Sequence, residues 1–194
     1  MVDLNERVIE EAVHEGESML LRELFDLVER GHDERSGVSH EALSAYARRL
    51  ADRDDFDLDA DGLLDEIDDR TTASETWAGY DRFYELGDGR LSQYPTLWHD
   101  RLGGSDDVTA YLRFVRDEQP AFVDDQDHGG AGDGIPEDTL VHVLMVVGRL
   151  DQGAATRAIE EARDRDVVAE DLDQHPQANV ALTDRGRDGS DTGS

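Results

Sequence analysis

Polar breaks divide the last third of the chain into blocks of apolar residues, and the spacing within each block is typical of one secondary-structure element. The blocks lie at 140–147, 154–163, 166–170 and 178–183. The first two have the period of helices, and Pro136 suits a first helical turn, where its missing N–H has no partner. The last two are short and bounded by polar turns, as strands are. This order predicts a small α+β domain with a two-stranded ribbon over 135–187.

The chain before residue 118 predicts a bundle of helices. Apolar residues recur three and four positions apart between 4 and 28, and Gly16 divides that pattern into two helices. Ser39 is placed to cap a third helix, because its hydroxyl can accept a hydrogen bond from a first-turn N–H. Asp106 or Asp107 can cap a further helix in the same way. We therefore expect a fold that is mainly α.

Most of the aromatic residues lie between Thr72 and Leu86. Trp77, Tyr80 and Tyr84 are spaced three and four apart, as on one face of a helix. An aromatic stripe of this kind is more typical of a core than of a ligand site, so we expect this helix face to be buried.

Glycine and charged residues dominate 124–134, a composition with little to bury that is typical of a linker. The tail is equally polar, and we expect it to be disordered. The predicted organisation is a helical domain at 3–118, a linker at 119–134, the α+β domain at 135–187 and a disordered tail at 188–194. We find no internal repeat in the sequence.

The charge of the chain is strongly negative. There are 48 aspartates and glutamates against 19 basic residues, all of them arginine, for a formal net charge of -29. In multimolar salt the Debye length falls to about 3 Å, so neighbouring carboxylates repel one another weakly. Acidity with a complete lack of lysine resembles the cytoplasmic proteins of extremely halophilic archaea, which implies a high-salt cytoplasm. The alternative is an acidic interaction protein or a partly disordered one.

The sequence also excludes several kinds of chemistry. Without cysteine it offers no disulfide, thiolate metal site or thiol nucleophile. Its first residues do not form a signal peptide, and no apolar run approaches the roughly 20 residues of a membrane span. We expect a cytoplasmic protein without membrane contact. We expect no catalysis either, because His99 and Asp100 are the best-placed acid–base pair and neighbours on a helix point different ways.

Aspartates alternate with other residues at the start of a stretch that ends at Asp68. The spacing resembles the calcium loop of the EF-hand family, which implies ion ligands at Asp57, Asp59, Asp61, Leu63 (through its carbonyl) and Asp68. The last ligand in that family is usually glutamate, so the shorter Asp68 should weaken calcium binding and favour magnesium. The alternative is that Asp61 caps a helix. No other cofactor is expected.

Two junctions resemble those of winged-helix transcription regulators, a helix-turn-helix family: 163–168 at a helix end and first strand, and 182–187 after the second strand. The resemblance implies that the helix at 154–163 enters the major groove of DNA. Base edges would be contacted by Gln152, Thr156, Arg157 and Glu160, and phosphates by Arg185 and Arg187. Most such domains have one more helix than 136–187 can hold. Either the helix near Asp107 is the first of three, or the domain is a reduced variant.

The expected partner is DNA or a protein. Affinity for DNA normally depends on neutralising phosphates, whereas Glu161, Asp164 and Glu170 lie near the expected contact surface and the sequence shows no basic patch there. A winged helix that binds protein, or serves as a scaffold without touching DNA, is therefore the alternative to nucleic-acid-linked transcription regulation. Winged-helix proteins commonly dimerise through added helices, so we also expect a homodimer through the amino-terminal helices.

Overall fold

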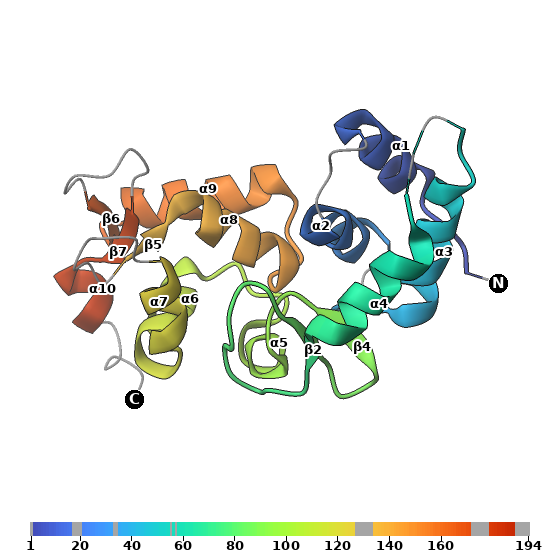
Figure 1. Cartoon of the computed structure of the whole chain (residues 1–194). Coiled ribbons are helices and arrows are strands. Elements are labelled where there is room, and N and C mark those ends of the chain that lie inside the picture. Colours follow the sequence, from blue (N-terminus) through green and yellow to red (C-terminus); the bar gives the residue numbers. More distant parts are fainter. Residues whose placement is uncertain are drawn as a thin grey trace. The chain divides into compact units, whose positions relative to one another are not determined.

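The structure is a computed structural model in which two compact units share a mainly helical fold (Figure 1). It describes residues 2–16, 21–32, 35–54, 56, 58–126, 134–171 and 179–188. Unit 1 consists of Met1–Glu75 and Tyr80–Leu97, and unit 2 of Thr76–Gly79 and Trp98–Ser194. No helix among the described residues has both the length and the apolar character needed to cross a membrane.

Unit 1 packs four helices against a small sheet. Its elements are α1 (Glu6–Glu15), α2 (Leu21–Gly31), β1 (Val38–Ser39), α3 (His40–Ala51), α4 (Ala60–Arg70), β2 (Thr71–Thr72), β3 (Phe83–Glu85) and β4 (Arg90–Ser92). The sheet order is β1-β4-β3-β2, and only the β2–β3 pair is parallel. The predicted cap of the third helix is confirmed, because the Ser39 hydroxyl accepts from the Ala42 N–H at 3.2 Å. The predicted break near Gly16 is confirmed as well.

The core of unit 1 joins the helices to the sheet. Phe25 of α2 stacks on Phe83 of β3 with ring centroids 4.2 Å apart. Arg90 of β4 is buried, and its guanidinium donates to the backbone carbonyls of Ser36 and Gly37. These bonds satisfy an arginine that burial would otherwise destabilise, and they fix the connector before β1 against β4.

Unit 2 packs its helices around a second small sheet. Its elements are the last part of α5 (Thr96–Leu102), then α6 (Val108–Glu118), α7 (Pro120–Gln126), β5 (Ile135–Pro136), α8 (Glu137–Val146), α9 (Gln152–Asp164), β6 (Val168–Asp171), β7 (Asn179–Leu182) and α10 (Asp184–Asp188). The sheet is antiparallel in the order β5-β7-β6. Helices α8 and α9 lie side by side, and α6 packs against both α9 and β7 (Figure 1).

The two strands predicted near the carboxyl end pair as expected, with Val168 opposite Leu182 and Glu170 opposite Val180. The third strand, β5, was not predicted. It is only two residues long and pairs Ile135 with Val180, a contact between segments far apart in the sequence that a local pattern does not reveal.

The domain boundary also differs from the one predicted at residue 118. Helix α6 belongs to unit 2 because its apolar face packs against α9 and β7. Most of the first half of the predicted linker is the helix α7, and Gly134 at the other end is buried. The part of the linker at 127–133 and the tail from 189 lie outside the described residues.

The predicted aromatic helix is wrong. Residues 73–82 form no regular element, while Phe83 and Tyr84 lie on a strand. Trp77 belongs to unit 2, where it packs against the rings of Trp98 and Phe122, and Trp98 in turn packs against Phe114. Tyr80 is partly exposed in unit 1 and lies under the Arg22 guanidinium, 5.4 Å from its ring centroid. The expected burial is confirmed for Trp77 and Tyr84, which lie in the cores of different units, and is wrong for Tyr80.

Candidate recognition surface

Helix α9 begins at a capping aspartate and buries one narrow face. The Asp151 carboxylate accepts from the Ala154 N–H at 2.8 Å, which satisfies one of the helix's free donors. Ala155, Ile159 and Ala162 are fully buried against the rest of unit 2. Since these residues recur at three and four positions, the opposite side of the helix faces solvent.

That exposed side carries the residues predicted to meet base edges. Gln152, Arg157 and Glu160 are exposed. Thr156 is half-buried, and its hydroxyl donates to the Gln152 carbonyl at 2.9 Å within the helix. The structure therefore brings the four residues onto one solvent-facing stretch of α9. Its charge is mixed, because Glu161 and Asp164 are exposed there too.

The two residues predicted to meet phosphates lie on a different helix. Arg185 and Arg187 are exposed on α10, on either side of the buried Gly186. The Thr183 hydroxyl, just before α10, donates to the Asp166 carbonyl at 2.7 Å. The predicted site residues thus form two groups, one on α9 and one on α10.

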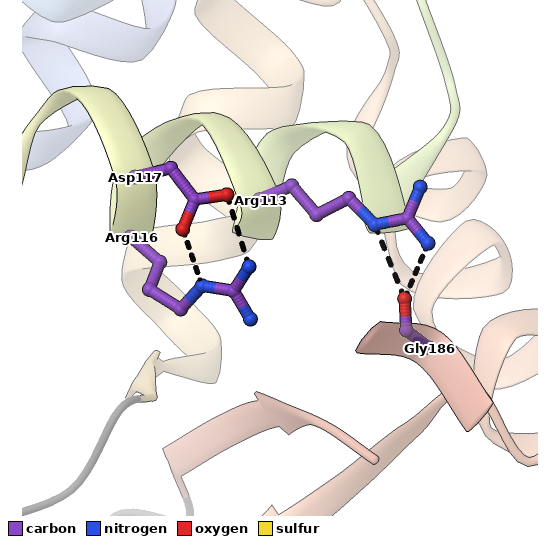
Figure 2. Close-up of polar contacts among 4 residues, drawn as sticks. All are labelled: Arg113, Arg116, Asp117 and Gly186. Carbon is purple, nitrogen blue, oxygen red and sulfur yellow. Dashed lines mark hydrogen bonds and ion pairs between the residues drawn. The ribbon is translucent and has the colours of Figure 1, made fainter. Parts of the chain in front are cut away.

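A residue that the sequence did not single out holds α10 in place. Arg113 of α6 donates from Nε to the Gly186 carbonyl at 3.1 Å, and its Nη2 donates to the same oxygen (Figure 2). A Cβ on Gly186 would lie 2.1 Å from the Val167 carbonyl oxygen, so only glycine allows this close approach. The one sequence signal for Arg113 was its position among the apolar residues of α6, where an arginine needs a partner.

Most arginines of unit 2 already have acidic or carbonyl partners. Arg116 makes a bidentate pair with Asp117 at 2.6 and 2.9 Å, and this hydrogen bonding lowers the pKa of the Asp117 carboxyl group (Figure 2). Arg163 pairs with Glu137. By contrast, Arg157 and Arg185 make no side-chain hydrogen bond or ion pair with other described residues. These two guanidinium groups are the ones that an anionic ligand would meet without displacing a partner.

The predicted ion loop lies in a segment that is largely helical. Asp57 is outside the described residues, and helix α4 begins at Ala60. Asp59 caps that helix by accepting from the Gly62 N–H at 3.0 Å, Asp61 lies in its first turn, and Leu63 lies within it. Asp68 is near the helix end and faces His40 at 3.2 Å. These four residues follow the helix instead of surrounding one point.

Helix capping accounts for part of the aspartate pattern. The capping residue is Asp59, whereas the alternative stated above expected Asp61. Phe56 is buried in the core of unit 1, and Leu58 packs against it. Within the part of the chain that the structure describes, no three acidic or histidine side chains are grouped to hold a metal ion. Binding of calcium or magnesium stays a prediction, because Asp57 is not among those residues.

Unit 2 as a whole is acidic. Its segments 76–79 and 98–194 carry nine arginines against 22 aspartates and glutamates. Comparisons with protein-family models, with curated proteins and with solved structures found no match to this chain. Function must therefore be inferred from the exposed side of α9 and from its charge.

Proposed function

We propose that unit 2 is a winged-helix domain, that α9 is its recognition helix, and that it acts in nucleic-acid-linked regulation. The order α6, α7, β5, α8, α9, β6, β7 supports this proposal once the short helix α7 is counted as an insertion, with α6, α8 and α9 packed on a three-stranded antiparallel sheet. Helix α6 then provides the first of the three helices that the family pattern requires. The observation that carries the proposal is the solvent-facing side of α9.

In this proposal the exposed residues of α9 read a duplex in the major groove. Arg157 donates two hydrogen bonds to the O6 and N7 of a guanine, and Gln152 matches the donor and acceptor of an adenine. Glu160 accepts from the amino group of a cytosine. The free guanidinium of Arg157 is the strongest of these groups, because a charged bidentate donor makes shorter and stronger hydrogen bonds than a neutral one.

A second candidate, binding of a protein partner, is supported by the charge of the same surface. Glu160, Glu161 and Asp164 outnumber Arg157 on the exposed side of α9. Carboxylates beside a phosphate backbone repel it unless salt screens them, and DNA affinity itself falls as salt rises. A cationic protein surface would be attracted by these carboxylates instead of repelled.

Fluorescence anisotropy with a labelled random-sequence duplex distinguishes the two candidates. The full chain would be titrated over a KCl series that reaches multimolar concentration, with far-UV circular dichroism at each step to verify folding. We expect binding that weakens linearly in log–log plots against KCl. Arg157→Ala should weaken it, by roughly 5- to 150-fold for those duplexes in which the bidentate guanine contact is made and by less for the rest.

The matched control is Arg101→Ala, which removes an exposed arginine of α5 that faces Glu118 at 3.6 Å. It should leave the affinity unchanged. If a folded chain gives no anisotropy change at any KCl concentration, nucleic-acid recognition is refuted and the protein-binding candidate takes its place. If both variants weaken binding equally, only net charge matters and α9 is not a recognition helix.

A further inference from the structure

The two units repeat one topology. Apart from the edge strand β2 in unit 1 and the short helix α7 in unit 2, each has a helix, a two-residue strand, two more helices and a closing hairpin: α2, β1, α3, α4, β3, β4 in unit 1 and α6, β5, α8, α9, β6, β7 in unit 2. In both, the first strand pairs antiparallel with the last, and the last pairs antiparallel with the one before it. The correspondence lies in the order and pairing of these elements, whereas the sequence itself shows no repeat.

The repetition extends to single residues around the first strand. A glycine precedes that strand in each unit, and a Cβ there would collide with a carbonyl of the last strand: 2.6 Å from Leu91 O at Gly37, and 2.9 Å from Val180 O at Gly134. The next residue in the chain pairs with that same carbonyl-bearing residue, as Val38 with Leu91 and Ile135 with Val180. The next helix starts two residues after the paired residue of the first strand: α3 starts at His40, after Val38, and α8 starts at Glu137, after Ile135.

Burial patterns of the corresponding helices agree, with an offset of 87 residues in the first helix and 97 in the second. In the first helix, positions 24, 25, 27 and 28 are buried in unit 1, and 111, 112, 114 and 115 in unit 2. In the second helix the buried sets include 43, 46, 47 and 50 against 140, 143, 144 and 147. The offset of the second set, 97, is also the offset between Gly37 and Gly134.

The third helices correspond as well. Each is capped by an aspartate that accepts from the N–H three residues later, Asp59 in α4 and Asp151 in α9. Eight residues after the cap, each buries an isoleucine, Ile67 or Ile159. The position two residues before the isoleucine is exposed in both helices. It is occupied by Asp65 in α4 and Arg157 in α9.

We infer that the chain is a tandem of two copies of one unit, and that nucleic acid is contacted by α9 of unit 2 and not by the corresponding helix α4 of unit 1. The second part of this inference rests on the function proposed for unit 2. Where α9 offers a free guanidinium, α4 offers the Asp65 carboxylate, and its other exposed charged residues are acidic too: Asp61, Glu66, Asp68 and Asp69. Helix α4 thus holds the position of a recognition helix but repels phosphate.

A segment transplant tests the duplication without any ligand. In the full chain, residues 134–140 are replaced by residues 37–43, which preserves the glycine and the final leucine and changes the five positions between them. The control transplants 36–42, the same stretch one residue out of register. We expect the in-register chain to keep native near-UV circular dichroism, and the shifted chain to lose it. Loss of native signal in both chains would overturn the duplication.

The anisotropy assay tests the division of labour between the copies. Asp65→Asn removes one charge from α4, and we expect it to leave the affinity for the labelled duplex unchanged while Arg157→Ala weakens it. A change beyond about threefold, the range for an exposed charge pair, would overturn the exclusion of nucleic acid from α4. If the wild-type chain binds no duplex, the proposed function of unit 2 fails and this part of the inference fails with it. The transplant still decides the duplication.

Discussion

Phe122→Ala should destabilise unit 2 and leave unit 1 intact. The Phe122 ring is fully buried, 4.7 Å from Trp77 and 4.8 Å from Trp98 between centroids, at steep interplanar angles of 87° and 74°. Truncating a buried phenylalanine to alanine costs about 3–5 kcal/mol. That measured total already includes lost ring pairs, each worth about 0.5–1.5 kcal/mol beyond its buried area, so we expect a value in the middle of the range, about 4 kcal/mol. For a urea m-value of about 2 kcal/mol/M, the unfolding midpoint falls by about 2 M.

Urea unfolding in multimolar KCl would measure this shift with two signals. Both tryptophans of the chain, Trp77 and Trp98, lie in the same cluster of unit 2, so tryptophan fluorescence reports on that unit. Far-UV circular dichroism reports on both units. The matched control is Phe25→Ala, which removes a buried ring stacked on Phe83 in unit 1. It should lower the urea midpoint of the part of the circular dichroism transition that comes from unit 1 and leave the midpoint of the fluorescence transition unchanged.

The outcome that refutes this reasoning is specific. If Phe25→Ala moves the tryptophan transition as far as Phe122→Ala does, the two units do not unfold separately and the division of the chain is wrong. If Phe122→Ala moves no transition by more than about 0.5 M, a loss near 1 kcal/mol, the ring cluster does not stabilise unit 2.

Three further predictions use other parts of the structure. Gly37→Ala should cost about 1–3 kcal/mol in urea unfolding, because φ is 67° and the new Cβ meets a carbonyl, whereas Gly87→Ala, which meets no atom within 4 Å, should be near neutral. Arg113→Gln should cost about 1–2 kcal/mol by the same measurement, through its lost bonds to α10, and an unchanged midpoint would refute that anchor. Burial raises the pKa of Tyr94 and of Tyr111 above 10, so an absorbance titration should show two tyrosines that ionise at higher pH than a free tyrosine does. Because those folded-state pKa values are raised, the contribution of the two tyrosines to stability should be constant below about pH 10, the unfolded value, and should be lost as pH rises from there through the folded-state values.

Local features of the fold could be read from the sequence because their causes are local. Ser39 and Asp107 accept hydrogen bonds from first-turn N–H groups, and this needs only the right side chain just before an apolar period. The two strands of the closing hairpin were visible for the same reason, as short apolar runs around a polar turn. The mainly helical fold class is confirmed on these grounds.

Features that depend on distant partners could not be read in this way. The spacing of Trp77, Tyr80 and Tyr84 is helical, yet Trp77 packs with residues near 98 and 122 while Tyr84 packs in unit 1. The anchor from Arg113 to Gly186 spans 73 positions. Likewise, alternating aspartates are equally compatible with an ion loop and with the cap of α4, and what separates them is where the helix begins.

The repeated topology is not apparent in the sequence because the fold constrains the size and polarity of residues and not their identities. At Gly37 and Gly134 the constraint is the lack of a Cβ, which only glycine meets, so the residue is the same in both units. At the buried helix positions any apolar side chain of fitting volume suffices, and tyrosine in one unit stands against valine in the other. At exposed positions packing does not constrain the residue type, so the corresponding residues, Asp65 and Arg157, can differ. The difference in charge at that position therefore does not follow from how each unit folds.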